Sequence, residues 1–100
     1  MCGFTGYYDL NFNHDESIIK RMTDTLISRG PDSYGIYVNK QIGISLGHRR
    51  LSIQDLSDNA SQPMKSLNNR FVIVFNGEIY NHLELRNKLN KEISYRNWKS

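Results

Sequence analysis

The sequence predicts an α+β fold in which helices cover at least one β-sheet. Apolar residues recur every fourth position from Ile18 to Leu26, with Ile19 beside them, as on one face of a helix. Two alternating segments, residues 34–38 and 42–46, are typical of a β-hairpin. The run 71–75 is apolar without alternation, which favours a strand buried on both faces.

The first two elements are predicted from local signals. Residues 3–8 are expected to form a strand, with glycine at two places where a bulky side chain would obstruct packing. Asp15 is predicted to cap the following helix, whose apolar stripe includes Met22. Gly30-Pro31 is expected to end this helix, because glycine permits the left-handed stop and proline cannot continue it.

The remaining elements follow in the same way. The hairpin is expected to turn at Asn39-Lys40, and its second strand leads into a polar loop that Pro63 closes. After the buried run, Asn81 followed three residues later by Glu84 resembles a helix-capping pair. The helix that this pair predicts would have two leucines on one face, Leu85 and Leu89.

Size and composition limit the class of protein. One hundred residues are enough for one small core, so we expect one globular unit or part of one. No apolar run of about eighteen residues could span a membrane. With no signal peptide and a single cysteine, the expected location is the cytoplasm. Nucleic-acid binding is not expected, because the basic residues behind the net charge of +3 are scattered along the chain.

The only cysteine, Cys2, directly follows the initiator methionine and is the first candidate catalytic residue. Removal of Met1 would leave one residue with both a thiol and a free α-amine. Reference pKa values are about 8.5 for the thiol and about 7.7 to 8.0 for the amine, so the amine can take the thiol proton. The alternatives are a buried structural cysteine and a lipid anchor, although no apolar segment precedes Cys2 to support the anchor.

Two other positions have both a structural and a catalytic interpretation. Asn76-Gly77 is a common hairpin turn signal, but at the end of a buried strand an amide and a backbone N–H could also form an oxyanion hole. Arg50 could be a surface residue or could bind a carboxylate through two hydrogen bonds. The histidines and Cys2 do not have the close spacing of zinc ligands, so no metal site is expected.

Five motifs, in matching order and spacing, resemble the class II glutamine amidotransferase domain. Within that family their form is similar to the glutamine-hydrolysing asparagine synthetases. The motifs are Met1-Cys2-Gly3, Arg29-Gly30-Pro31-Asp32, His48-Arg49-Arg50-Leu51-Ser52-Ile53 with Asp55, Gln62-Pro63-Met64 and Asn76-Gly77-Glu78-Ile79-Tyr80-Asn81. The resemblance implies an N-terminal-nucleophile hydrolase with an αββα sandwich, of which residues 1–100 would be the N-terminal portion.

The resemblance also implies roles for the matched residues. Cys2 would attack the side-chain amide of glutamine while its own α-amine moves the proton. The Asn76 side chain and the Gly77 backbone N–H would hold the oxyanion, and Arg50 would bind the α-carboxylate of glutamine. The other substrate-binding positions would be Leu51, Ile53 and Glu78.

The products implied are glutamate and ammonia, and ammonia would pass to an ATP-dependent synthetase domain that activates aspartate, in cis or in trans. ATP and Mg would belong to that domain, so no cofactor is expected in this chain. A Ser-Asp-Thr-Glu type segment of the family does not appear before Ser100, so the chain is expected to be a truncated glutaminase domain whose own activity is open. A non-catalytic module, an N-terminal cysteine hydrolase of another amide, and a homodimer also remain open.

Overall fold

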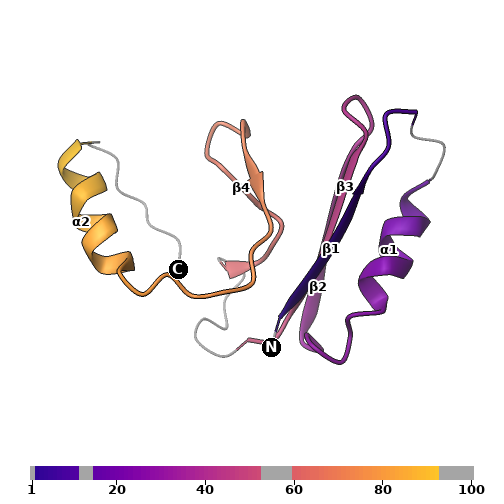
Figure 1. Cartoon of the computed structure of the whole chain (residues 1–100), viewed down its shortest axis with the longest axis horizontal. Coiled ribbons are helices and arrows are strands. Elements are labelled where there is room, and N and C mark those ends of the chain that lie inside the picture. Colours follow the sequence, from indigo (N-terminus) through magenta and orange to yellow (C-terminus); the bar gives the residue numbers. More distant parts are fainter. Residues whose placement is uncertain (1, 12–14, 53–59, 93–100) are drawn as a thin grey trace.

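The computed structural model describes residues 2–11, 15–52 and 60–92 (Figure 1). The elements are β1 (Gly3–Tyr8), α1 (Glu16–Asp24), β2 (Ser33–Asn39), β3 (Ile44–Arg50), β4 (Met64–Lys65), β5 (Val72–Ile73) and α2 (His82–Glu92). The two helices and two antiparallel sheets confirm the predicted α+β class. The αββα sandwich stays a prediction.

The larger sheet has three strands in the order β1-β3-β2, all antiparallel to their neighbours. The predicted hairpin is therefore confirmed. Its second strand runs on to Arg50, beyond the alternating residues that end at Leu46, because β1 and β2 both pair with it and satisfy its backbone. The register places Gly3 beside Arg49, so the start of β1 and the end of β3 lie together.

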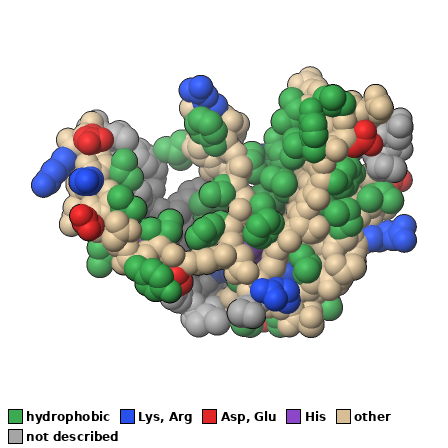
Figure 2. All heavy atoms as spheres, viewed as in Figure 1, with side chains coloured by type: hydrophobic (Ala, Val, Ile, Leu, Met, Phe, Trp, Pro, Cys, Tyr) green, Lys and Arg blue, Asp and Glu red, His purple; other side chains and the backbone are tan. Residues whose placement is uncertain are grey.

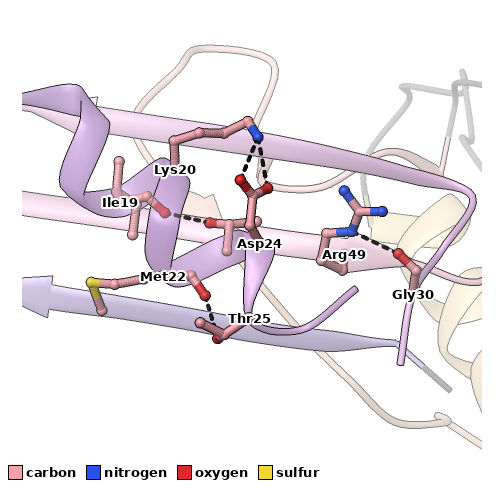
Figure 3. Close-up of polar contacts among 8 residues, drawn as sticks. Ile19, Lys20, Met22, Asp24, Thr25, Gly30 and Arg49 are labelled. Atoms are coloured by element: carbon pink, nitrogen blue, oxygen red, sulfur yellow. Dashed lines mark hydrogen bonds and ion pairs between the residues drawn. The ribbon is translucent and has the colours of Figure 1, made fainter. Parts of the chain in front are cut away.

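Helix α1 begins where the sequence predicts. The Asp15 side chain accepts a hydrogen bond of 3.0 Å from the backbone nitrogen of Ser17, as expected of an N-cap. The regular helix ends at Asp24, and a series of turns leads from there to Gly30. Figure 3 shows the polar contacts that close this end, including the 2.6 Å hydrogen bond from the Thr25 hydroxyl to the Met22 carbonyl.

The buried face of α1 agrees in part with the predicted stripe, which includes Ile19. Ile19 and Thr23 are fully buried, whereas Met22 is only half-buried. Thr23 faces Gly47 of β3, where a Cβ atom would lie 1.9 Å from the Thr23 Oγ1 atom. The helix therefore approaches the sheet most closely at a glycine, and a polar side chain occupies the centre of the contact.

The short β4–β5 sheet lies on the side of the large sheet opposite to α1 (Figure 1). Among the described residues, β4 and the residue two positions before it contact β2. The Lys65 ammonium lies 5.6 Å from the centre of the Tyr37 ring of β2, and the Gln62 carbonyl packs against Gly35. The large sheet is thus covered on one face by a helix and on the other by a hairpin.

The prediction that residues 71–75 form a strand buried on both faces is wrong. Only Val72–Ile73 is a strand, and the exposed fractions of Phe71, Ile73 and Phe75 are 63%, 54% and 41%. Within the described chain β5 pairs with β4 alone. Figure 2 shows hydrophobic side chains at the surface of this hairpin and of α2.

The predicted last helix is confirmed as α2, which follows Asn81 directly. It buries none of its residues, and Leu85 and Leu89 are 41% and 39% exposed. Its apolar side therefore makes little contact with the described part of the chain. Among the described residues, no helix has both the length and the apolar character needed to cross a membrane.

Candidate active site

The candidate site begins at Cys2, which immediately precedes β1 and is half-buried. The backbone N–H of Leu51 donates to its Sγ atom at 3.4 Å, and the thiol donates to the Leu51 carbonyl at 3.7 Å. Leu51 is the first residue after β3, so the pairing of β1 with β3 brings the two together. The predicted nucleophile and one predicted substrate-binding residue are therefore adjacent in space.

Arg49 and Arg50 end β3 and point to opposite faces of the sheet, as successive strand residues do. The Arg49 Nε atom donates to the Gly30 carbonyl at 2.7 Å, on the α1 side (Figure 3). Arg50 lies on the hairpin side and is only 7% exposed. The interpretation of Arg50 as an ordinary surface arginine is therefore wrong, because a central strand buries it.

The corner at residues 29–32 holds both strand ends of the site. The Arg29 Nε atom donates to the Cys2 carbonyl at 3.1 Å, and the Asp32 Oδ2 atom accepts from the Ser52 nitrogen at 2.7 Å. The Asp32 nitrogen also donates to the Arg50 carbonyl at 3.0 Å. From the sequence, this corner was interpreted as a helix stop and as one of the motifs of the family resemblance, without a role for its charged side chains. Its charged side chains instead fix the backbone on either side of the thiol.

His48 is a buried residue whose place in the site the sequence did not indicate. It is 1% exposed on the same face of β3 as Arg50, and its Nε2 atom has no hydrogen-bond partner among the described atoms. Burial lowers the pKa of His48 below 6.5, the Phe75 backbone raises it, and the Arg50 charge lowers it. His48 of β3 is therefore close to the backbone of Phe75, in the segment that leads to Asn76.

Asn76 and Gly77 follow β5 in an exposed segment. The hairpin-turn interpretation of this pair is wrong, because the next element after β5 is α2 rather than a partner strand. Neither residue has the positive φ that a type I′ turn requires; among the described residues only Asn69 and Gly43 do. In the described structure, Asn76 and Gly77 therefore do not connect two strands.

The predicted site residues fall into two groups. Cys2, Arg50 and Leu51 lie together at one end of the large sheet. The second group is carried by the exposed segment after β5 and consists of Asn76, Gly77 and Glu78. Ile53 lies outside the described residues. Within the described ranges, no cluster of three or more histidine, cysteine, aspartate or glutamate side chains could hold a metal ion.

The family model of the glutamine amidotransferase domain matches residues 1–100 of this chain. The chain belongs to this amidotransferase family. It is 41% identical over 93 residues to asparagine synthetase [glutamine-hydrolyzing] 1 of Bacillus subtilis, covering 89% of this chain and 14% of that protein. It is 40% identical over 95 residues to asparagine synthetase [glutamine-hydrolyzing] of Brassica oleracea, covering 89% of this chain and 15% of that protein. No solved structure matches.

The amidotransferase chain thus spans about a seventh of the length of these relatives. Within that span the described structure contains a thiol, a buried guanidinium and an exposed asparagine-glycine pair, on Cys2, Arg50 and Asn76 with Gly77. A thiol can attack an amide carbon, a guanidinium can bind a carboxylate, and amide N–H groups can stabilise an oxyanion. These are the groups that hydrolysis of an amino-acid amide requires.

Proposed function

We propose that this amidotransferase domain hydrolyses the side-chain amide of L-glutamine, with Cys2 as the nucleophile after removal of Met1. The observation that supports the proposal most directly is the contact of Cys2 Sγ with the Leu51 backbone nitrogen and carbonyl, at 3.4 and 3.7 Å. These contacts hold the thiol at the strand end that also carries Arg50. A positioned nucleophile beside a group for carboxylate binding suits an amino-acid substrate.

The proposed reaction has two steps. The Cys2 Sγ atom bonds to the amide carbon of glutamine while its proton passes to the α-amine of Cys2. The amine then gives this proton to the amide nitrogen, the C–N bond breaks, and ammonia leaves. Water then attacks the thioester, which releases glutamate and returns the proton to sulfur. The Asn76 side chain and the Gly77 N–H donate to the oxyanion that forms in each step.

Arg50 binds the α-carboxylate of glutamine in this proposal, and Leu51, Ile53 and Glu78 complete the binding site. Arg50 is 7% exposed, and a charged hydrogen bond is stronger where water is largely excluded. Burial of this guanidinium therefore supports a binding role over a solvated one. Glu78 carries the charge that complements the α-amino group.

We further propose that the ammonia passes to a synthetase domain, in cis or in trans, which uses ATP and Mg to convert aspartate to asparagine. The names of the relatives, glutamine-hydrolysing asparagine synthetases, support this acceptor. ATP and Mg would bind that domain rather than this one. The cytoplasm is the proposed location, and a homodimer is compatible with the proposal.

The test is Cys2→Ala in the full-length protein that carries this domain. We expect glutamate release from glutamine to be lost, while asparagine formation from added ammonium and the thermal melting curve are retained. Glutamate release by the variant at the parental rate would contradict the proposal. A parent that releases no glutamate would favour a non-catalytic module, and a parent that hydrolyses another amide without competition by glutamine would favour a different substrate.

A further inference from the structure

The β4–β5 ladder stops short of Asn76. It pairs Met64 with Ile73 and Lys65 with Val72. Continued toward Asn76 in the same register, the next positions facing each other would be Pro63 with Val74 and then Gln62 with Phe75. The Ser66 nitrogen donates to the Phe71 carbonyl at 2.9 Å, so alternate facing pairs exchange main-chain hydrogen bonds, and Gln62 with Phe75 would be the next such pair after Met64 with Ile73.

The Gln62 side chain, rather than its main chain, forms the hydrogen bonds with the backbone of Phe75. The Phe75 nitrogen donates to its Oε1 atom at 2.6 Å, and its Nε2 atom donates to the Phe75 carbonyl at 3.1 Å. A primary amide offers one acceptor and donors in the same plane, as a strand partner does. Gln62 therefore satisfies both backbone groups of the residue that immediately precedes Asn76.

The main chain of Gln62 is held against the large sheet. Its carbonyl oxygen would lie 2.1 Å from a Cβ atom at Gly35 of β2, an approach that only glycine permits. Gly35 pairs with His48 of β3, and the backbone of Phe75 contributes to the pKa of His48. The two hydrogen bonds of Gln62 thus connect the segment that carries Asn76 to the sheet that carries Cys2.

We propose that Gln62 is a positioning residue for the oxyanion site. By holding both polar groups of the Phe75 peptide backbone, it sets the direction in which the chain leaves β5 and so where the Asn76 amide and the Gly77 N–H point. Oxyanion donors act only at hydrogen-bonding distance from the developing charge, so a small displacement costs rate. This inference rests on the proposed glutamine hydrolysis.

The experiment compares Gln62→Met with Gln41→Met in the full-length protein. Methionine keeps the length of the side chain and removes both hydrogen bonds, and Gln41 is an exposed turn residue that provides the matched control. We expect Gln62→Met to lower kcat for glutamine hydrolysis about 10- to 100-fold with KM changed by less than about twofold, and Gln41→Met to change neither. Gln62→Glu retains the acceptor for the Phe75 N–H and should lose less kcat.

Hydrogen exchange gives a second readout that does not depend on catalysis. The Phe75 amide should exchange faster in Gln62→Met than in the parent, while the ladder amides of β4 and β5 keep their protection. Parental kcat in Gln62→Met, or a lower melting temperature with kcat unchanged, would overturn the positioning role. If Gln62→Met does not fold, kcat is compared between Gln62→Glu and the parent instead. If neither variant folds, the positioning role is rejected and Gln62 is required for folding.

The same assays separate this inference from the function on which it rests. If the parent has no activity that depends on Cys2, the proposed function fails and the positioning role fails with it. If the parent hydrolyses glutamine through Cys2 and Gln62→Met retains the parental kcat, only the positioning role is rejected.

Discussion

The Sγ atom of Cys2 lies 3.4 Å from the backbone nitrogen of Leu51, although 49 positions separate the two residues. The antiparallel pairing of β1 with β3 creates this contact, and Arg29 reinforces it by donating to the Cys2 carbonyl at 3.1 Å. The thiol is therefore held by the sheet. A nucleophile at a chain end is otherwise poorly ordered, so this support gives the predictions below a defined geometry.

The first prediction concerns Met1. We expect the mature protein to lack it, because a retained methionine would place the nitrogen of Cys2 in a peptide bond and remove the proposed base. The measurement is the intact mass of protein purified from cells, together with its glutaminase activity. An active protein that still carries Met1 would contradict the proposed role of the α-amine.

The second prediction tests carboxylate binding by Arg50. Arg50→Lys keeps the charge but cannot reproduce two parallel hydrogen bonds, so KM for glutamine should rise about tenfold or more, given roughly 1.5–3 kcal/mol for a charged hydrogen bond. The control is Arg21→Lys, at an exposed position of α1. An unchanged KM in Arg50→Lys would remove Arg50 from the binding site.

The third prediction tests the oxyanion role of Asn76. Asn76→Asp replaces a donor with a negative acceptor, and we expect kcat to fall about 100- to 1,000-fold, or roughly 2.7–4 kcal/mol. KM should change much less, because the charge develops after glutamine binds. Asn87→Asp on the exposed side of α2 makes the same chemical change elsewhere. Parental turnover by Asn76→Asp would show that this amide does not act on the oxyanion.

The fourth prediction concerns the packing of α1 on β3. Gly47→Ala would place a Cβ atom 1.9 Å from Thr23 Oγ1, so the helix must move away from the sheet. We expect a loss of about 1–3 kcal/mol in the free energy of unfolding, measured by urea denaturation. Adding Thr23→Ala removes the clashing hydroxyl and should recover part of this loss. Simple addition of the two single effects would argue against a direct clash.

The fifth prediction is a pH dependence of stability from His48. Burial lowers its pKa in the folded state below 6.5, so the unfolded chain binds the proton more readily. Its contribution is fully present above about pH 6.5 and is lost as the pH falls below that value. The free energy of unfolding should therefore fall more steeply from about pH 7 to 5 in the parent than in His48→Gln.

The sequence by itself determined the local elements and the family. The strand at residues 3–8, the cap at Asp15 and the hairpin were all predicted from residues close together in the chain, and the structure confirms them. Periodicity and capping are local properties, so they can be interpreted without knowing the fold. The sequence motifs predicted membership of the glutamine amidotransferase family in the same way, and the match of the family model confirms this prediction.

Only the tertiary structure decided which of these residues are buried and which contact each other. Three residues of the apolar run, Phe71, Ile73 and Phe75, are exposed, whereas Arg50 and His48 are buried. The Gln62 side chain satisfies the backbone of Phe75, 13 positions away and beyond the end of the β4–β5 ladder. Burial depends on which distant segments cover a residue, and a side chain can replace a main-chain partner only where the fold places it beside an unpaired strand end.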